Sequence, residues 1–389
     1  MGAGVPNLPP PVFVNDAAGL DPNKILAEMI EAFEAATGRK LQPAQVERLL
    51  INLYAYRESL VRDAIQYAAE QNLLAFARFP MIDYLGGLLG VTRLAAQAAT
   101  TILEFTLQQP LTVNLTIAKG TQVGTTDGLI VFATDADLVI AAGQTSSTIS
   151  TTAQTAGAEG NGYIAGQVSV LLNPNVHIRS ARNTTVTSGG SAPETDDHLR
   201  TRIQAAPNEF SVAGPVGAYR FFALSADPTI IDALVASPAP GEVTVHVLTG
   251  PITAQPASSP NAQGIASAPL LAKVQQALNA DEVRPLTDTV AALAVSEVDY
   301  EITGTVTIYA DADPTATMGA ALAAARQFAL NLASRIQRDI VPSEIIAALS
   351  VPGVYDVELS APALMQLSAG EWANCTAITL GEAVASQHS

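Results

Sequence analysis

The sequence predicts an α+β protein of several domains, with long N-terminal helices, a central β-rich domain and C-terminal α/β domains built from strand–helix–strand units. Three observations predict this class: a long stretch without Gly or Pro near the N-terminus, a central stretch rich in Thr, Val and Gly, and a C-terminal half in which strand-like and helix-like patterns alternate. Because 48% of the residues are apolar and only 14% are charged, the chain is expected to bury a real core. We expect an N-terminal helical region at 1–98, a β-rich domain at 99–192, a helical joint with a first α/β unit at 193–296, and a C-terminal α/β unit at 297–389.

The N-terminal region contains two predicted helices. Asp21 followed by Pro22 is a good helix start, because the carboxylate can cap the first turn and the proline ring fixes a helical φ. This helix is expected to end near Gly38. A second helix is predicted over Gln42–Ala77, and its roughly 35 residues would form a rod of about 50 Å.

One half of the second helix is apolar along its length. The apolar stripe is about 180° wide, whereas packing against one neighbour commonly needs about 100°, so we expect two neighbours, of which one can belong to another chain. Arg57 lies within the apolar half, where its guanidinium either pairs with a carboxylate or reaches water at the edge. The candidate interface residues are Leu49, Leu53, Tyr56, Arg57 and Leu60.

The rest of the chain is predicted to hold a β domain followed by two strand–helix–strand units. Thr101–Leu107 and Leu111–Ile117 alternate between apolar and polar residues, as half-buried strands do. Further on, Glu242–Leu248 and Ile302–Ile308 alternate in the same way, and Pro240 with Gly241 suits a type II turn. Helices are predicted at about 269–279, 317–335 and after 342, and further strands near 289–295 and 353–359.

Composition opposes several classes of function. The net charge is −17, with most of the excess acid in the C-terminal half, so we expect no nucleic-acid partner, since binding phosphates requires Lys and Arg. No run of about 18 apolar residues and no N-terminal signal peptide is present, so no membrane insertion is expected. The single cysteine, Cys375, suits a reducing cytoplasm. The phosphate-loop, HExxH, GxSxG and EF-hand patterns are absent, so we expect no cofactor, no metal and no catalytic residue.

The densest cluster of ionisable residues lies at 194–197. Ser191 and Glu194 have the spacing of a capping box, and Asp196 and Asp197 fall in the first turn of a predicted helix, where they complement its dipole. Asp196 and Arg200 are spaced as an i,i+4 ion pair. Stabilisation of the first turn of a helix is therefore enough to account for each of these residues.

The same helix has an apolar side and a natural end. Leu199 and Ile203 form its apolar face, and Pro207 is expected to end it. We interpret the segment as a joint between the β domain and the α/β half. The alternative is a hydrolase or carbohydrate-binding module whose site is the acidic cluster at 194–197.

Seven segments follow one another over about residues 80–300: YLGGLLGVTRLAAQAA at Tyr84, IAKGTQVGTTDGLIVFAT at Ile117, AGAEGNGYIAGQVS at Ala156, SGGSAPETDDHLRTRI at Ser188, AGPVGAYRFFALSADP at Ala213, SPAPGEVTVHVL at Ser237 and VRPLTDTV at Val283. In this order they resemble the baseplate J-like proteins of contractile-tailed phages such as Mu and of related phage-tail-like particles. Ala118 departs from the family pattern, which usually has Pro there, and the two ends of the chain match less clearly.

The resemblance implies a structural role and no catalytic residue. It implies a baseplate wedge protein, assembled in the host bacterial cytoplasm and carried in the tail baseplate of the virion or particle, that links the central hub and spike to the periphery. The implied partners are other copies of the chain in dimer-like pairs within each wedge, a smaller tail protein, and the hub, spike and sheath-proximal baseplate proteins.

Overall fold

The computed structural model describes residues 11–14, 21–210, 215–250, 264–280, 283, 285 and 287–384. The N-terminus considered for a signal peptide, and parts of the resembling segments at Ala213 and Val283, lie outside these residues. The chain divides into two compact units. The first holds the described residues up to Arg93 together with Asp196–Gln204, and the second holds Leu94–Thr195 and the described residues from Ala205 onward.

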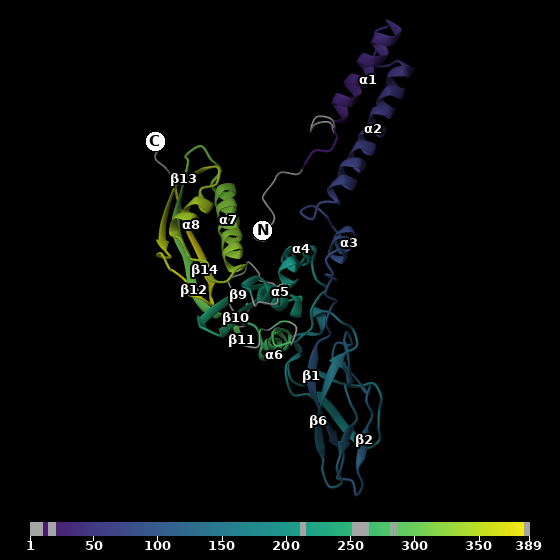
Figure 1. The fold of residues 1–389 in the computed structure, drawn as a ribbon, viewed down its shortest axis with the longest axis vertical. Coiled ribbons are helices and arrows are strands. Elements are labelled where there is room, and N and C mark those ends of the chain that lie inside the picture. Colours follow the sequence, from purple (N-terminus) through teal and green to yellow (C-terminus); the bar gives the residue numbers. More distant parts are fainter. Residues whose placement is uncertain are drawn as a thin grey trace. The chain divides into compact units, whose positions relative to one another are not determined.

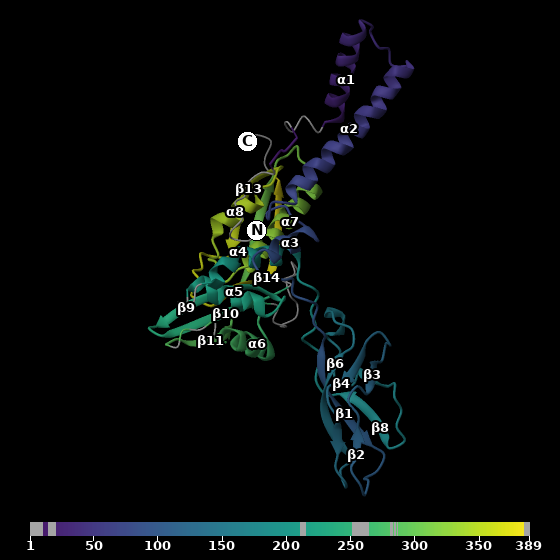
Figure 2. The ribbon, with the colours of Figure 1, turned by 45° about the vertical axis from the view of Figure 1, so that its right-hand side comes forward.

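The first unit is helical. Its helices are α1 (Pro22–Thr37), α2 (Val46–Glu70), α3 (Met81–Gly87) and α4 (Asp196–Ala205). Figures 1 and 2 show α1 and α2 side by side as a hairpin. The predicted limits of α1 are confirmed: the Asp21 carboxylate accepts a hydrogen bond from the Asn23 N–H at 2.9 Å, and Gly38 closes the helix in the left-handed region at φ 68°.

Helix α2 is shorter than the sequence predicted, with 25 residues and a length of about 38 Å. Before it, the chain forms a turn in which the Gln42 N–H donates to Gln45 Oε1 at 3.1 Å. At its end, Asn72 Nδ2 donates to the Ala68 carbonyl at 2.9 Å. This side chain takes up a carbonyl at the end of the helix, so the predicted extension to Ala77 is wrong.

The second unit begins with a β barrel-like domain, whose strands are β1 (Thr100–Leu107), β2 (Leu115–Ile117), β3 (Gln122–Thr125), β4 (Val131–Thr134), β5 (Leu138–Ile140), β6 (Ser146–Ala153), β7 (Val168–Leu171) and β8 (Ile178–Asn183). Six of them form an antiparallel sheet in the order β7-β3-β4-β6-β1-β8, and β7 contacts β8. The short pair β2-β5 lies apart from this sheet in the hydrogen-bond pattern, and a 3₁₀ turn, η2, spans Ala158–Gly160.

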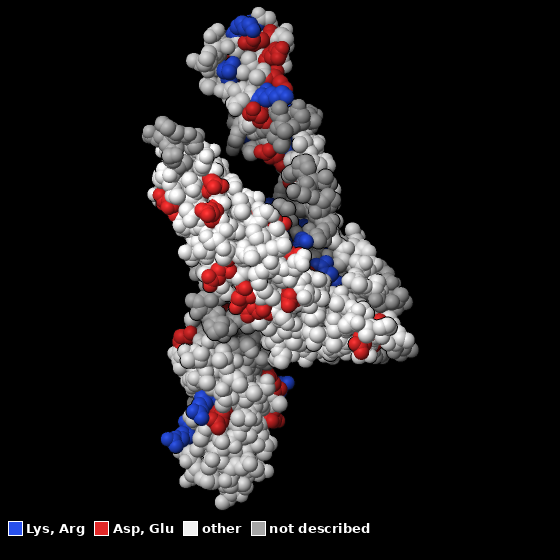
Figure 3. Space-filling view, turned by 90° about the vertical axis from the view of Figure 1, so that its left-hand side faces the viewer, with Lys and Arg blue, Asp and Glu red and all other residues white. Residues whose placement is uncertain are grey.

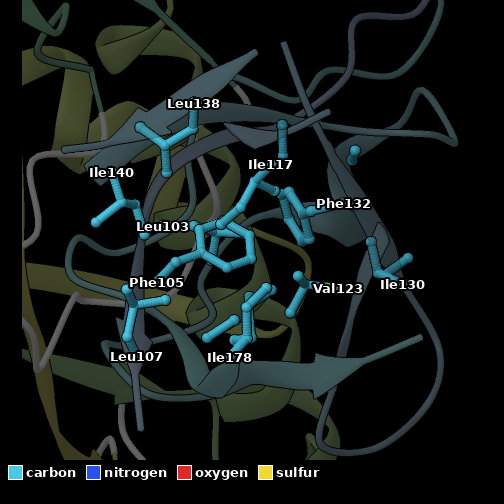
Figure 4. Close-up of a cluster of buried hydrophobic side chains, with 14 residues drawn as sticks. Leu103, Phe105, Leu107, Ile117, Val123, Ile130, Phe132, Leu138, Ile140 and Ile178 are labelled. Atoms are coloured by element: carbon cyan, nitrogen blue, oxygen red, sulfur yellow. The ribbon is translucent and has the colours of Figure 1, made fainter. Parts of the chain in front are cut away.

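The alternation in β1 produces the core of this domain. Leu103, Phe105 and Leu107 point inward and are buried, while the residues between them are more exposed. Figure 4 shows them packed against side chains such as Phe132 and Ile140 from neighbouring strands. The predicted strand at Leu111–Ile117 is only partly correct.

The first part of that predicted strand is irregular for a visible reason. Gly143 N–H donates to the Leu111 carbonyl at 2.8 Å, and Ala142 N–H donates to Asn114 Oδ1 at 3.0 Å. The Asn114 side chain thus accepts a hydrogen bond that a backbone carbonyl would accept in a regular sheet. Regular pairing of β2 with β5 therefore begins only at Leu115.

The chain continues through a 3₁₀ turn, η3 (Ala206–Phe210), into the first predicted strand–helix–strand region: α5 (Val216–Ala226), β9 (Ile230–Ala239), β10 (Glu242–Thr249), α6 (Ala268–Leu278) and β11 (Thr289–Ala294). β10 and β11 pair in parallel across the connection that contains α6, and β9 pairs with β10 in an antiparallel hairpin. Gly241, at φ 79°, occupies the turn between β9 and β10, as the Pro-Gly pattern predicts.

The C-terminal region contains β12 (Ser296–Ile308), α7 (Pro314–Ala333), α8 (Pro342–Leu349), β13 (Val354–Ala361) and β14 (Glu371–Val384). The strands form the C-terminal sheet in the order β13-β12-β14, with β12 antiparallel to β13 and parallel to β14. Buried side chains of α7 and α8 pack with those of β12 in one core. With this region in place, the predicted α+β multidomain class is confirmed.

Candidate functional site

The apolar face of α2 is exposed. Only Ala55 and Ser59 of this helix are buried, and α1 packs against a different side of α2. The exposed fractions are 58% for Leu49, 56% for Leu53, 58% for Tyr56 and 41% for Leu60. Contiguous exposed apolar side chains of this size are typical of surfaces that contact another protein.

Arg57 is exposed and makes no ion pair with any residue that the structure describes. It lines a groove of about 500 Å³ between α1 and α2, together with side chains that include Phe33, Tyr54 and Val61. The single chain therefore agrees with the second interpretation of Arg57, in which the guanidinium reaches water while the aliphatic part of the side chain lies along apolar surface.

The acidic segment has a different environment, because Asp196 is held by residues far away in the sequence. Arg93 Nη2 donates to Asp196 Oδ1 at 2.7 Å and lies 2.8 Å from Asp83 Oδ2, while the Phe79 N–H donates to Asp196 Oδ2 at 3.1 Å. The guanidinium also lies over the Phe79 ring, 5.7 Å from its centroid. These contacts fasten the start of α4 to the rest of the first unit.

Two predicted contacts of this segment are wrong. Arg200 pairs with Asp197 rather than with Asp196, and it also donates to the Leu74 and Ala77 carbonyls at 2.7 and 2.8 Å. These carbonyls follow α2 and lie outside any helix, so a guanidinium with several donors satisfies them better than a local ion pair would.

The predicted capping box does not form either. Ser191 is in backbone pairing with Gln97, whose N–H donates to the Ser191 carbonyl at 2.9 Å, and this extended segment ends before α4 begins at Asp196. The Ser191 Oγ is buried without a hydrogen bond to any described group. Glu194 is buried, and its Oε2 accepts a hydrogen bond from the Leu94 N–H at 2.8 Å. Nothing in the structure explains the unpaired Ser191 hydroxyl.

Other features of the segment are as predicted. Leu199 and Ile203 are buried and form the apolar face of α4, and the helix ends just before Pro207. Asp196 and Asp197 lie in the first turn, where carboxylates complement the helix dipole.

The electrostatics of Asp196 are those of a structural carboxylate. Burial acts to raise the pKa of Asp196, but the hydrogen bonds from Arg93 and from the Phe79 N–H outweigh it and hold the pKa below its usual value. A general acid needs the opposite shift, toward neutral pH. Among the described residues, no group of three or more His, Cys, Asp and Glu side chains could hold a metal ion.

A pair of matched substitutions separates a structural role from a catalytic one. Asp196→Asn should lower the free energy of unfolding of the helical unit by about 1–2 kcal/mol, because it weakens the bonds to Arg93 and Phe79. Asp197→Asn should change it by less than about 1 kcal/mol, because the Asp197 side chain is 94% exposed. Thermal unfolding followed by circular dichroism measures both values. Equal stability of the two variants, with loss of a polysaccharide-degrading activity present in the parent, would contradict the structural role.

Sequence reasoning missed Arg93 as the partner of Asp196, and Asp83 as the second carboxylate that Arg93 binds. Arg93 lies 103 residues before Asp196, so no local spacing rule could connect them. The search for membrane spans gives a simpler result: within the described part of the chain, none of the helices combines the length and the apolar character needed to cross a bilayer.

Comparison with known proteins gives four family-model matches in succession along the chain. They are the baseplate J-like protein N-terminal domain at residues 47–100, the barrel domain at 102–190, the central domain at 211–294 and the C-terminal domain at 300–381.

Individual proteins match as well. Baseplate protein J of Escherichia phage P2 is 38% identical over 185 residues, which cover 48% of this chain and 58% of that protein. The match therefore spans little more than half the length of that relative. The six-fold symmetrised cryo-EM structure of the anti-feeding prophage baseplate matches with a TM-score of 0.45 and 15% identity, covering 91% of this chain and 90% of that one.

Proposed function

We propose that this chain, which belongs to the baseplate J-like protein family, is a structural wedge subunit in the tail baseplate of a contractile phage or a related tail-like particle. The observation that carries the proposal is the succession of N-terminal, barrel, central and C-terminal family domains along one chain. The name of the P2 relative, Baseplate protein J, supports the same role. The four parts bounded at residues 98, 192 and 296 remain our prediction for the domains of this chain.

In this role the chain links the central hub and spike to the peripheral baseplate through protein–protein contacts. Its proposed partners are other copies of itself in dimer-like pairs within each wedge, a smaller tail protein, and the hub, spike and sheath-proximal proteins. No nucleic acid and no membrane insertion are part of the proposal. The subunit would assemble in the host bacterial cytoplasm and remain in the virion or particle.

The proposed contact surface is the exposed apolar face of α2, with Leu49, Leu53, Tyr56, Arg57 and Leu60 at its centre. Burying a large apolar side chain contributes about 1.5–3 kcal/mol relative to leaving it exposed. Four such residues in one helical stripe can therefore supply much of the free energy of a stable helix–helix contact.

We propose no catalytic activity. Two of the carboxylates considered for a hydrolase or carbohydrate-binding module are engaged in bonds between distant parts of the chain: Glu194 with Leu94, and Asp196 with Arg93. The third, Asp197, makes a local ion pair with Arg200. This engagement supports a structural role for the acidic segment.

Charge placed on the α2 face should block assembly. Leu53→Asp and Leu60→Asp are expected to abolish complex formation with co-expressed tail proteins, because a carboxylate without a partner is strongly unfavourable in an apolar contact. Native mass spectrometry and size-exclusion chromatography measure the complex. The isolated variants should unfold within about 0.5 kcal/mol of the parent, since both leucines are exposed in the single chain.

Val113→Asp is the matched control, because Val113 is 68% exposed but lies in the barrel domain. It should leave assembly intact. A parent chain that stays a monodisperse monomer with every candidate tail protein would contradict the wedge proposal. If the isolated Leu53→Asp chain is strongly destabilised as well as unable to assemble, this face belongs to the hydrophobic core of the single chain and is not an interface.

A further inference from the structure

The outer edge of the C-terminal sheet has no partner strand. β14 is the last strand in the order β13-β12-β14, and it pairs with β12 from Glu371 opposite Ser296 to Val384 opposite Ile308. The register shifts once, between Tyr300 and Glu301, where Thr376 has no partner on β12. No other strand that the structure describes pairs with β14 on its far side. Such an edge presents a row of backbone N–H and C=O groups to which another strand can add.

The core-facing side chains of β14 are incompletely covered. On the central strand, Ile302, Val306 and Ile308 are fully buried, with an exposed fraction of 0%. Opposite them on β14 lie Ile378, which is half-buried, Glu382, which is exposed, and Val384, which is 58% exposed. A further strand on this edge would cover apolar surface that the single chain leaves in contact with water.

The outward face of the same sheet is acidic. Glu297, Asp299 and Glu301 alternate along β12 and are exposed, and Asp356 and Glu358 follow on β13. The three strands contain no Lys, Arg or His. Figure 3 shows separate acidic side chains on the surface of this part of the chain.

At the start of β14, Asn374 lies opposite Asp299, and its Nδ2 donates to Glu297 Oε1 and to Asp299 Oδ1. Further along, β14 offers little bulk on the outward face. The residues opposite Glu301, Thr305 and Thr307 are Ala377, Gly381 and Ala383. A long side chain from an added strand could lie across these small residues and reach the carboxylates of β12. An added strand would lie two strand spacings, about 10 Å, from β12, which is close to the Debye length of about 8 Å at physiological salt.

We propose that the free edge of β14 docks an extended segment of a partner protein whose side chains alternate between apolar and basic. The apolar side chains would cover Ile378, Leu380 and Val384, and the basic ones would reach Glu301 across Ala377. The backbone ladder would supply affinity, and the acidic face would select the partner. The inference rests on this sheet alone and does not depend on the α2 contact or on the proposed wedge role.

Charge argues against a second copy of the chain as the occupant. Pairing β14 with β14 of another copy would join two outward faces that carry carboxylates and no basic group, and like charges at this range repel. The opposite edge is a poorer site. β13 is only eight residues long, carries Asp356 and Glu358, and is followed by Pro362, which has no N–H to donate.

The test uses the full chain and two short synthetic peptides, one alternating Lys with Val and one alternating Glu with Val. The Lys/Val peptide should bind, as measured by fluorescence anisotropy, and should slow amide hydrogen exchange in residues 376–384. The Glu/Val peptide should do neither. Glu301→Lys and Gly381→Lys should each weaken Lys/Val binding about three- to tenfold, because they place a basic group where the ligand's own would lie. A Cβ at Gly381 meets only Thr305 Oγ1 at 3.6 Å and Gly304 O at 3.7 Å, so this residue tolerates the change.

Asp135→Lys is the matched control, with the same change of charge at an exposed residue between β4 and β5 of the barrel-like domain. It should alter binding by less than about twofold, because salt screens a charge that is far from the contact. Equal weakening by Asp135→Lys and Glu301→Lys would overturn the proposal in favour of unspecific attraction between charges. Binding without slower exchange in β14 would also overturn it. Exchange that slows with protein concentration alone would identify a second copy as the occupant. None of these outcomes bears on assembly through α2, so failure here is distinguishable from failure of the proposed function.

Discussion

Replacing Trp372 with alanine is expected to lower the free energy of unfolding of the second unit by about 3–5 kcal/mol. Trp372 is 1% exposed and packs with Leu248, Val295 and Ile336 in a cluster that joins β10 to the C-terminal region. Its indole Nε1–H donates to the Ala333 carbonyl at 2.7 Å. The substitution therefore leaves a large cavity and an unpaired buried carbonyl at once.

Two companion variants make this result specific. Trp372→Phe should cost about 1–2 kcal/mol, because it keeps most of the packing and removes the hydrogen bond. Tyr355→Ala should have a smaller effect, since Tyr355 is 47% exposed. Chemical denaturation monitored by circular dichroism gives all three values. A Trp372→Ala chain as stable as Tyr355→Ala would show that this cluster does not hold the region together.

Loss of Arg93 should have the next largest effect. Arg93→Gln is expected to destabilise the helical unit by about 2–3 kcal/mol, because Asp83 and Asp196 would face each other without the cation that binds both. The value lies below that of a fully buried pair because the Asp83 and Asp196 side chains are 30% and 31% exposed. Lys40→Gln removes the same charge from a side chain that is 85% exposed, and it should leave the stability nearly unchanged.

The effect of Arg93→Gln should depend on pH. In the parent chain the pKa of Asp196 is held below its usual value, so the stability that Asp196 contributes is fully present above about pH 4 and is lost as the pH falls through its lower folded pKa. In the variant that contribution is absent. The difference between parent and variant should therefore be largest near neutral pH and shrink below about pH 4, as urea titrations at several pH values can measure. A difference that grows in acid would contradict the role of the ion pair.

The sequence predicted well where the relevant physics is local. The limits of α1 follow from Asp21 and Gly38, which act within one turn of the helix they bound. The alternation of β1 and the turn at Gly241 have the same character. The family resemblance, carried by ordered segments, gave the class of protein beyond what these patterns could.

Prediction failed where distant residues compete with local rules. Asn72 binds a carbonyl at the end of α2 locally, but the carbonyls beyond it are bound by Arg200, which no pattern between residues 42 and 77 could indicate. The spacing of Asp196 and Arg200 likewise favours a local ion pair, whereas Asp196 binds the remote Arg93 and Arg200 binds Asp197. The candidate interface on α2 is exposed in the single chain, which is expected of a surface that binds another chain. Its contacts with other chains remain a prediction.

The position of α4 constrains the order in which a growing chain can fold. The hydrogen bond from Arg200 to Leu74 spans 126 residues, and the whole barrel-like domain is synthesised between the two. At about 5–20 residues per second, the first helices would wait on the order of 10 s for α4 to emerge from the ribosome. Closing so long a loop in a disordered chain would cost about 4 kcal/mol of entropy.

A barrel that folds first removes that cost. Its two ends are tied together where the Leu94 N–H donates to Glu194 Oε2 at 2.8 Å and the Glu194 N–H donates to the Leu94 carbonyl at 3.0 Å. Arg93 and Asp196 lie just outside this pair of residues in the sequence, so a folded barrel brings them close enough to form their ion pair. The folded barrel thus acts on the helical unit as an intramolecular template, and mutations that slow its folding should delay completion of helices encoded before it.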